Sequence, residues 1–164
     1  MKKLINFLLF YFGWYISVTF HNIYAAAIVI SVALVSSIIM SYKYKEIIII
    51  IGLAILGSLS DAIAYKFGIY SFTYSNKFLI LDNVWLISLW ILFLATFNGS
   101  LIFLKRAKLY TLSCIGFLGG VFSYFLAFKL GTINFPDTFL SLFYIGIIWS
   151  CVFPVLYKAY HRIL

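Results

Sequence analysis

Six stretches of this 164-residue chain are almost free of charged side chains, and each is about as long as a membrane-spanning helix. A helix needs roughly 20 apolar residues to cross a hydrocarbon core about 30 Å thick. The pattern therefore predicts an all-α fold, a polytopic bundle of six transmembrane helices forming a single integral membrane domain over residues 1–164. The predicted spans are residues 4–20, 24–40, 47–67, 84–104, 109–128 and 138–160.

The composition excludes a soluble domain of this length. Charged residues make up 10% of the chain and hydrophobic residues 65%, whereas soluble domains carry about 25% charged residues. Residues 4–40 are nearly continuous in their apolar character, and as one helix they would be roughly 55 Å long. His21-Asn22 is the polar pair within this stretch, so we expect a tight turn there.

The amino-terminal segment also resembles a signal peptide. Lys2 and Lys3 precede an apolar core, and small residues follow at Ala25–Ala27. The core of a secretory signal is usually about 7–15 residues long, and this apolar run is longer. We therefore expect a first span that is retained.

The distribution of Lys and Arg predicts the orientation, because these residues stay on the cytoplasmic side. Six spans place both termini on the same side as the second and fourth loops. Nine of the twelve cations fall on that side: Lys2, Lys3, Lys43, Lys45, Lys105, Arg106, Lys108, Lys158 and Arg162. The other three are Lys66, Lys77 and Lys129. We expect cytoplasmic termini, with the lipid bilayer as the surrounding partner. Cations at the ends of apolar runs serve topology, so no nucleic-acid partner is predicted.

The sequence carries no pattern typical of a metal or cofactor site. His21 and His161 fall on opposite predicted sides, and no cluster of His, Cys and carboxylates has metal-ligand spacing. Cys114 and Cys151 lie inside apolar runs, where a thiol behaves as a small hydrophobe. A phosphate-binding loop and a G-x-S-x-G elbow are both absent from the sequence. We expect no metal and no cofactor.

Asp61 is the acid that lies well inside a predicted span, roughly 22 Å along the helix from Glu46. Burying an ionisable group in a bilayer is costly, so such a residue is a functional candidate. One interpretation is a proton acceptor or an anchor for a substrate group. The other is a hydrogen-bonded acid that holds helices together.

Residues at the depth of Asp61 could line a small cavity in the outer leaflet. The predicted binding set is Asp61, Tyr65, Trp85, Trp90, Ser123 and Tyr124. A second set of polar and small residues is expected to mediate helix packing, as such residues usually do in membranes. It comprises Thr96, Asn98, Ser100, Gly116, Gly119 and Gly120.

Three motifs, taken in order, resemble a bacterial inner-membrane family that is known only as a domain of unknown function. They are G-x-x-x-D ending at Asp61, W-L-x-x-L-W with T-x-x-x-S-L between Trp85 and Leu101, and G-G-x-x-S-Y ending at Tyr124. With smaller matches, the resemblance covers nearly the whole chain. It implies a small polytopic protein without an established activity, encoded near lipid-modifying enzymes.

Three functions remain open from the sequence. The first is a non-enzymatic protein that binds or moves a lipid-like or small amphipathic molecule. The second is a membrane-embedded lipid-modifying enzyme or subunit with Asp61 as general base. The third is a structural partner of another membrane protein, or a homo-oligomer, whose glycines and polar residues serve helix contacts.

Overall fold

The computed structural model describes residues 1–74 and 84–164, and that part of the chain contains six α-helices. Five of these helices are long and apolar enough to cross a membrane, as expected for a multi-pass membrane protein. The helices are α1 (Lys2–Phe20), α2 (Ile23–Met40), α3 (Tyr44–Lys66), α4 (Val84–Leu94), α5 (Leu109–Lys129) and α6 (Thr138–Ile163). The shorter elements are β1 (Ser71–Phe72), the 3-10 helix η1 (Ile102–Arg106) and β2 (Ile133–Asn134).

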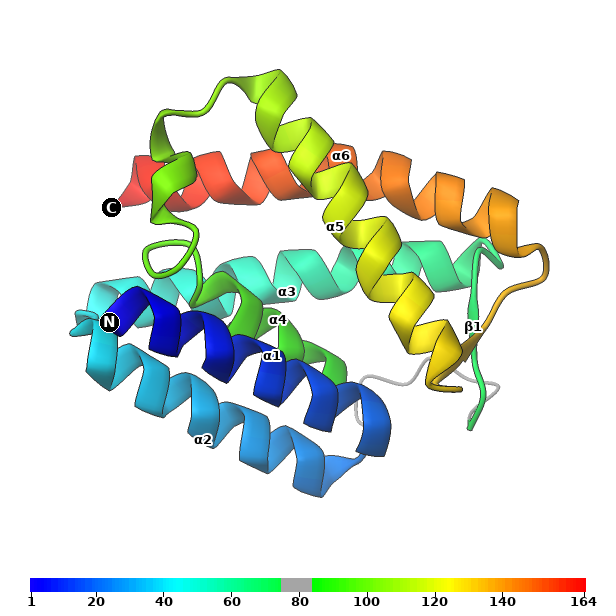
Figure 1. The fold of residues 1–164 in the computed structure, drawn as a ribbon, viewed down its shortest axis with the longest axis horizontal. Helices are drawn as coiled ribbons and strands as arrows, with labels where there is room; N and C mark the ends of the chain where they lie inside the picture. The colour runs from blue at the N-terminus through cyan, green and yellow to red at the C-terminus, as the bar shows by residue number, and fades with distance from the viewer. Residues whose placement is uncertain (75–83) are drawn as a thin grey trace.

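The helices run back and forth between two ends of the bundle, so both termini lie at the same end (Figure 1). The turn between α2 and α3 also lies at that end. At the opposite end, β1 and β2 pair antiparallel, with Phe72 opposite Ile133. Thr132 donates a hydrogen bond from Oγ1 to the carbonyl of Val18 over 2.6 Å, which joins this pair to the end of α1.

The turn between α1 and α2 falls at His21 and Asn22. His21 adopts a left-handed backbone conformation with φ of 33°. Asn22 caps α2, because its Oδ1 accepts a hydrogen bond from the amide of Ala25 over 2.9 Å. The long apolar stretch is thereby divided into an antiparallel pair of helices.

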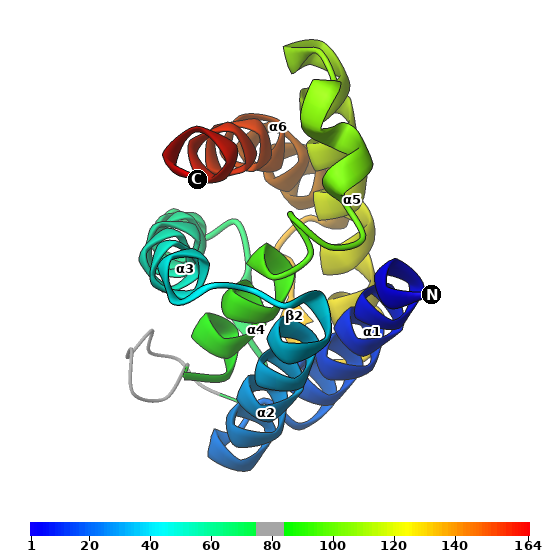
Figure 2. The ribbon, with the colours of Figure 1, turned by 90° about the vertical axis from the view of Figure 1, so that its left-hand side faces the viewer.

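Helix α4 occupies the middle of the bundle, where it packs against α1, α2 and α3 (Figure 2). The prediction of one continuous helix over residues 84–104 is wrong in its second half. The helix ends at Leu94, and turns lead through residues 95–101 into η1. Irregular backbone is tolerated at membrane depth only where protein covers it and satisfies its polar groups. The central position of α4 provides that cover.

Side chains from α1 and from the turn after α2 satisfy the irregular segment. Asn6 is 2% exposed, and its Nδ2 donates to the carbonyl of Ala95 over 3.1 Å. Its Oδ1 accepts from the amide of Ser100 over 2.8 Å. The Tyr42 hydroxyl also donates to the carbonyl of Ala95, over 2.7 Å. Burial, and next the charge of Glu46, raise the pKa of Tyr42, so its hydroxyl remains a donor.

Glu46 joins the first turn of α3 to the irregular segment and to α6. Its Oε1 accepts from Asn98 Nδ2 over 2.9 Å and from the Tyr160 hydroxyl over 3.2 Å. Its Oε2 accepts from the amide of Lys43 over 3.1 Å. The polar residues that end α4 early are therefore paired with polar residues at the same end of other helices.

Candidate functional site

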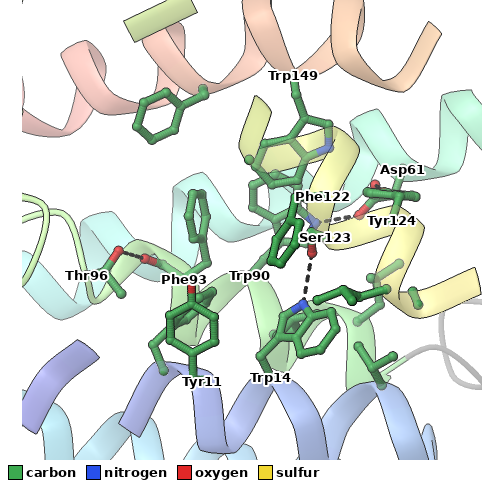
Figure 3. A pocket seen from close by; sticks show the side chains of 18 of the residues that line it. Tyr11, Trp14, Asp61, Trp90, Phe93, Thr96, Phe122, Ser123, Tyr124 and Trp149 are labelled. Carbon is green, nitrogen blue, oxygen red and sulfur yellow. Dashed lines mark hydrogen bonds between the residues drawn. The ribbon is translucent and has the colours of Figure 1, made fainter. Parts of the chain in front are cut away.

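A cavity of about 310 Å³ lies between α1, α4, α5 and α6, with Asp61 of α3 in its wall (Figure 3). All four tryptophans of the chain line this cavity. They are Trp14, Trp85, Trp90 and Trp149. Most of the remaining wall is aromatic or aliphatic, so the cavity suits an apolar occupant.

Asp61 is held by side chains from two other helices. It is 3% exposed. Its Oδ2 accepts a hydrogen bond from Trp90 Nε1 over 2.6 Å, and its Oδ1 accepts one from the hydroxyl of Tyr124. Both carboxylate oxygens are thus engaged, and the contacts connect α3 to α4 and α5.

Tyr70 supports this cluster from the segment that follows α3. Its hydroxyl donates to the main-chain carbonyl of Asp61 over 3.3 Å. Its ring meets the ring of Tyr124 edge-on, with centroids 5.4 Å apart. Burial, followed by the charge of Asp61, raises the pKa of Tyr70 well above its ordinary value. The hydroxyl of Tyr70 therefore remains a hydrogen-bond donor.

Trp90 stacks on Trp149 of α6, with ring centroids 5.0 Å apart and planes inclined by 10°. Two glycines make room for this pair. A Cβ on Gly57 would lie 2.8 Å from Trp90 Cζ3, and a Cβ on Gly120 would lie 2.6 Å from Trp149 Cβ. The glycines therefore allow α3 and α5 to approach the stacked indoles.

Trp14 and Ser123 connect α1 to α5. The indole Nε1 of Trp14 donates to Ser123 Oγ over 2.9 Å (Figure 3). The bond places a second polar contact on the cavity wall beside the Asp61 cluster. Between this region and Thr96, the wall is formed by aromatic side chains that include Phe93.

The structure brings five of the six residues in the predicted binding set to the cavity wall. These are Asp61, Trp85, Trp90, Ser123 and Tyr124. Tyr65 is elsewhere, with its ring stacked on Phe72 at a centroid distance of 5.5 Å. Whether these residues bind a ligand stays a prediction.

The second predicted set is divided by the structure. Thr96, Ser100, Gly116 and Gly119 line the cavity, and Gly116 also packs closely against Phe153 of α6. Asn98 instead donates to Glu46, and Gly120 packs against Trp149. We expected a small cavity at the depth of Asp61. Thr96 and Ser100 lie nearer the end that holds the termini, so the cavity extends further along the bundle than expected.

A family model described as "Protein of unknown function (DUF2878)" matches residues 3–155. The chain belongs to this family. The matched region contains every residue of the cavity wall. No curated protein and no solved structure matches the chain.

Two wall residues of this DUF2878 protein, Trp14 and Trp149, are absent from the binding set predicted from the sequence. Both lie well inside long apolar spans. Tryptophan is enriched at membrane interfaces. A tryptophan well inside a span is therefore unusual, and this position is the sequence signal that could have indicated a wall residue. The pairing of Trp14 with Ser123 and of Trp149 with Trp90 required the arrangement of the helices.

Side chains that line the cavity are also exposed on the outer faces of α1 and α5. Tyr11 of α1 is 45% exposed and Phe122 of α5 is 57% exposed, and Gly119 is exposed beside them. The cavity of the DUF2878 chain thus reaches the surface of the bundle between α1 and α5. That surface is the side of the helices, where lipid chains would surround a membrane protein.

Within residues 1–74 and 84–164, no three His, Cys, Asp or Glu side chains are grouped as metal ligands would be. The described polar chemistry of the cavity consists of hydroxyls, indole N–H groups and the carboxylate of Asp61. This set can orient a hydroxyl or amide group of an otherwise apolar ligand.

Proposed function

We propose that this DUF2878 protein binds a lipid-like or small amphipathic molecule in the cavity between α1 and α5. The observation that carries the proposal is the aromatic cavity of about 310 Å³ that reaches the side of the bundle. Ligand pockets are mostly apolar clefts of roughly 300–1,000 Å³ with a few polar groups. The cavity is at the lower end of that range, which suits part of one acyl chain or a compact apolar body.

The polar part of the ligand is placed at Asp61, Ser123 and Tyr124. Each carboxylate oxygen of Asp61 has accepted one hydrogen bond, and a carboxylate oxygen offers about two lone pairs. A ligand hydroxyl can therefore donate to Asp61 without displacing Trp90 or Tyr124. The aromatic wall beside this group covers the apolar remainder of the ligand.

The proposal includes six membrane crossings in a bacterial inner membrane, with both termini cytoplasmic. Its support is the distribution of cations, nine of which belong to the segments at one end of the bundle. Lys66 and Lys129 end α3 and α5 at the other end, and Lys77 lies outside the described residues. The fourth crossing is made by α4 together with residues 95–106.

Leucine at Gly119 tests ligand binding by occupying the space at the mouth of the cavity. A Cβ on Gly119 would meet nothing within 4 Å, and the residue lines the cavity. Gly52→Leu is the matched control, because Gly52 is also exposed and a Cβ there would also meet nothing within 4 Å, but it lies on α3 away from the cavity. A dibrominated monoacylglycerol is the probe, since bromine quenches tryptophan fluorescence and all four tryptophans line the cavity.

In detergent micelles, the probe is expected to quench the natural protein and Gly52→Leu with the same saturable dependence on concentration. Gly119→Leu should weaken this binding at least about tenfold while its melting temperature stays within a few degrees. Equal quenching of Gly119→Leu and Gly52→Leu would refute binding in this cavity.

The enzyme hypothesis is separated from binding by Asp61→Asn. The amide can still accept from Trp90 and can donate to the hydroxyl of Tyr124, so the fold should persist. A binding protein should bind the probe more weakly, because the neutral amide is a weaker acceptor for the ligand hydroxyl than the carboxylate, while the lipids of the cell stay unchanged. A lipid-modifying enzyme would lose its product, which a comparison of lipids extracted from deletion, Asp61→Asn and natural strains would reveal.

A further inference from the structure

A second hollow, separate from the aromatic cavity, lies at the end of the bundle that holds the termini. It is formed by η1, the start of α5 and the last turns of α6. Three cationic side chains line it, namely Lys105, Lys158 and Arg162, together with His161. Lys105, Lys158 and Arg162 are all exposed, so their charged groups are accessible.

None of the described acidic residues lines this hollow. Glu46 accepts hydrogen bonds from Asn98 and Tyr160, and Asp61 accepts from Trp90 and Tyr124. Asp137 caps α6 at the opposite end, where its Oδ1 accepts from the amide of Leu140 over 2.8 Å. The cations of the hollow therefore have no acidic side chain of the described residues beside them in its lining.

Two of the cations lie at the carboxyl end of α6, so the effect of the helix dipole on an anion has to be considered. The carboxyl end of a helix carries a partial negative charge and disfavours an anion. Lys158 and Arg162 are four residues apart, so they lie on one face of α6, and Lys105 reaches the same hollow from η1. Three cations from two segments can outweigh the helix dipole for an anion held between them.

The rest of the lining is apolar. Ala107, Leu112, Ala159 and Ile163 provide carbon atoms beside the cations. An inorganic anion gains little from such a surface, whereas a lipid presents a phosphate next to a glycerol backbone and acyl chains. Basic pockets between helices on the cytoplasmic side of membrane proteins bind anionic headgroups.

We propose that this hollow binds the phosphate group of an anionic phospholipid. Lys105, Lys158 and Arg162 contact the phosphate, and Arg162 can donate two parallel hydrogen bonds to its oxygens. The site is independent of the aromatic cavity and accepts a headgroup rather than an apolar chain. It would fix the carboxyl end of α6 and η1 at the surface of the leaflet.

The test uses the full chain in uncharged detergent, with three probes. These are dioctanoyl phosphatidylglycerol, dioctanoyl phosphatidylcholine and sodium phosphate, and bound lipid is counted by native mass spectrometry. The double variant Lys158→Gln/Arg162→Gln removes two of the three cations. Lys66→Gln/Lys129→Gln is the matched control, because it removes two cations at the other end.

The natural protein should bind phosphatidylglycerol at least about tenfold more tightly than phosphatidylcholine. Lys158→Gln/Arg162→Gln should lose that preference, whereas the control should keep it within about twofold. Gly119→Leu should also keep it, which separates this site from the aromatic cavity. Because both altered residues are exposed, the double variant should fold, and Lys105→Gln provides a second variant with a smaller loss.

Equal binding of the two lipids by the natural protein would overturn the proposal. So would an unchanged preference in both Lys158→Gln/Arg162→Gln and Lys105→Gln. Displacement of phosphatidylglycerol by an equal concentration of sodium phosphate would overturn the lipid assignment and indicate a site for free phosphate.

Discussion

The indole Nε1 of Trp90 lies 2.6 Å from the carboxylate Oδ2 of Asp61, and this buried hydrogen bond joins α4 to α3. The same indole ring of Trp90 stacks on Trp149 of α6. One indole therefore satisfies the acid of α3 and forms the aromatic wall that continues onto α6. Stability and the shape of the cavity depend on the same side chain.

Trp90→Phe is expected to destabilise the protein by about 1–3 kcal/mol, because it leaves Asp61 Oδ2 without its buried donor. The smaller ring also loses part of its stack on Trp149, and the matched control corrects for the loss of indole contact area. The free energy of unfolding in mixed detergent and denaturing surfactant measures it.

Trp14→Phe is the matched control for Trp90→Phe. It also removes an indole N–H, but the acceptor is the partly buried hydroxyl of Ser123. We expect a smaller loss, about 0.5–1.5 kcal/mol. A loss for Trp14→Phe equal to or above that for Trp90→Phe would contradict the importance assigned to the contact with Asp61.

Gly99→Ala should destabilise the irregular segment after α4. A Cβ on Gly99 would lie 2.6 Å from Asn6 Cγ and 2.8 Å from its Nδ2. Asn6 would have to move, and its hydrogen bonds to Ala95 and Ser100 would be lost or weakened. The expected change in the free energy of unfolding is at least about 1–3 kcal/mol, the usual range for overpacking.

Gly52→Ala provides the comparison for Gly99→Ala. A Cβ on Gly52 would meet nothing within 4 Å, and alanine forms helices better than glycine by up to about 1 kcal/mol. Unfolding measured in the same surfactant series should therefore show no loss for Gly52→Ala. Equal stability of the two variants would argue against tight packing of Asn6 on Gly99.

Gly120→Ala and Gly119→Ala change adjacent residues of α5 with opposite expected results. A Cβ on Gly120 would lie 2.6 Å from Trp149 Cβ and 2.8 Å from its Cδ1, whereas one on Gly119 would be free of contacts. Gly120→Ala should cost about 1–3 kcal/mol and shift the tryptophan emission as the stack with Trp90 is disturbed. Gly119→Ala should leave both measurements unchanged. The reverse pattern would show that Gly119, and not Gly120, faces Trp149.

Single cysteines test the proposed orientation in a protein whose Cys114 and Cys151 have been changed to serine. Cysteines in place of Lys66 and Lys129, at the ends of α3 and α5, should react with an impermeant maleimide in cells with a permeable outer membrane. Cysteines in place of Lys45 and Lys108 should react only after the inner membrane is opened. Labelling of Lys45 and Lys108 positions from opposite faces would disprove six crossings.

The ends of the long helices were largely predictable because the sequence marks them with charge or polarity. His21 and Asn22 divide the first apolar stretch, and Asp137 marks the start of α6. The early end of α4 was not predicted, because polar and small residues such as Thr96, Asn98 and Gly99 also occur within continuous membrane helices, where they mediate helix packing. The early end depends on Asn6, which lies 89 residues before Ala95 in the sequence. The side chain of Asn6 replaces hydrogen bonds that a longer helix would have made.

Five of the predicted binding residues meet at one cavity because depth along a helix follows from the regular rise per residue. Contact with the cavity does not follow from depth alone, and Tyr65 illustrates this. It lies one turn beyond Asp61 on α3, where its ring stacks on Phe72. The contributions of Trp14 and Trp149 depend on which helices are neighbours.

The chain by itself determined that its solvent must be lipid, since 10% charged residues cannot cover a water-soluble surface. It also determined where most helices begin and end and that Asp61 lies deep inside a helix, because these depend on local polarity. Only the packing of the helices decided that Trp90 and Tyr124 share Asp61, and that α4 stops at Leu94. Those outcomes depend on side chains far apart in sequence, which can satisfy one another's polar groups only after the bundle has formed.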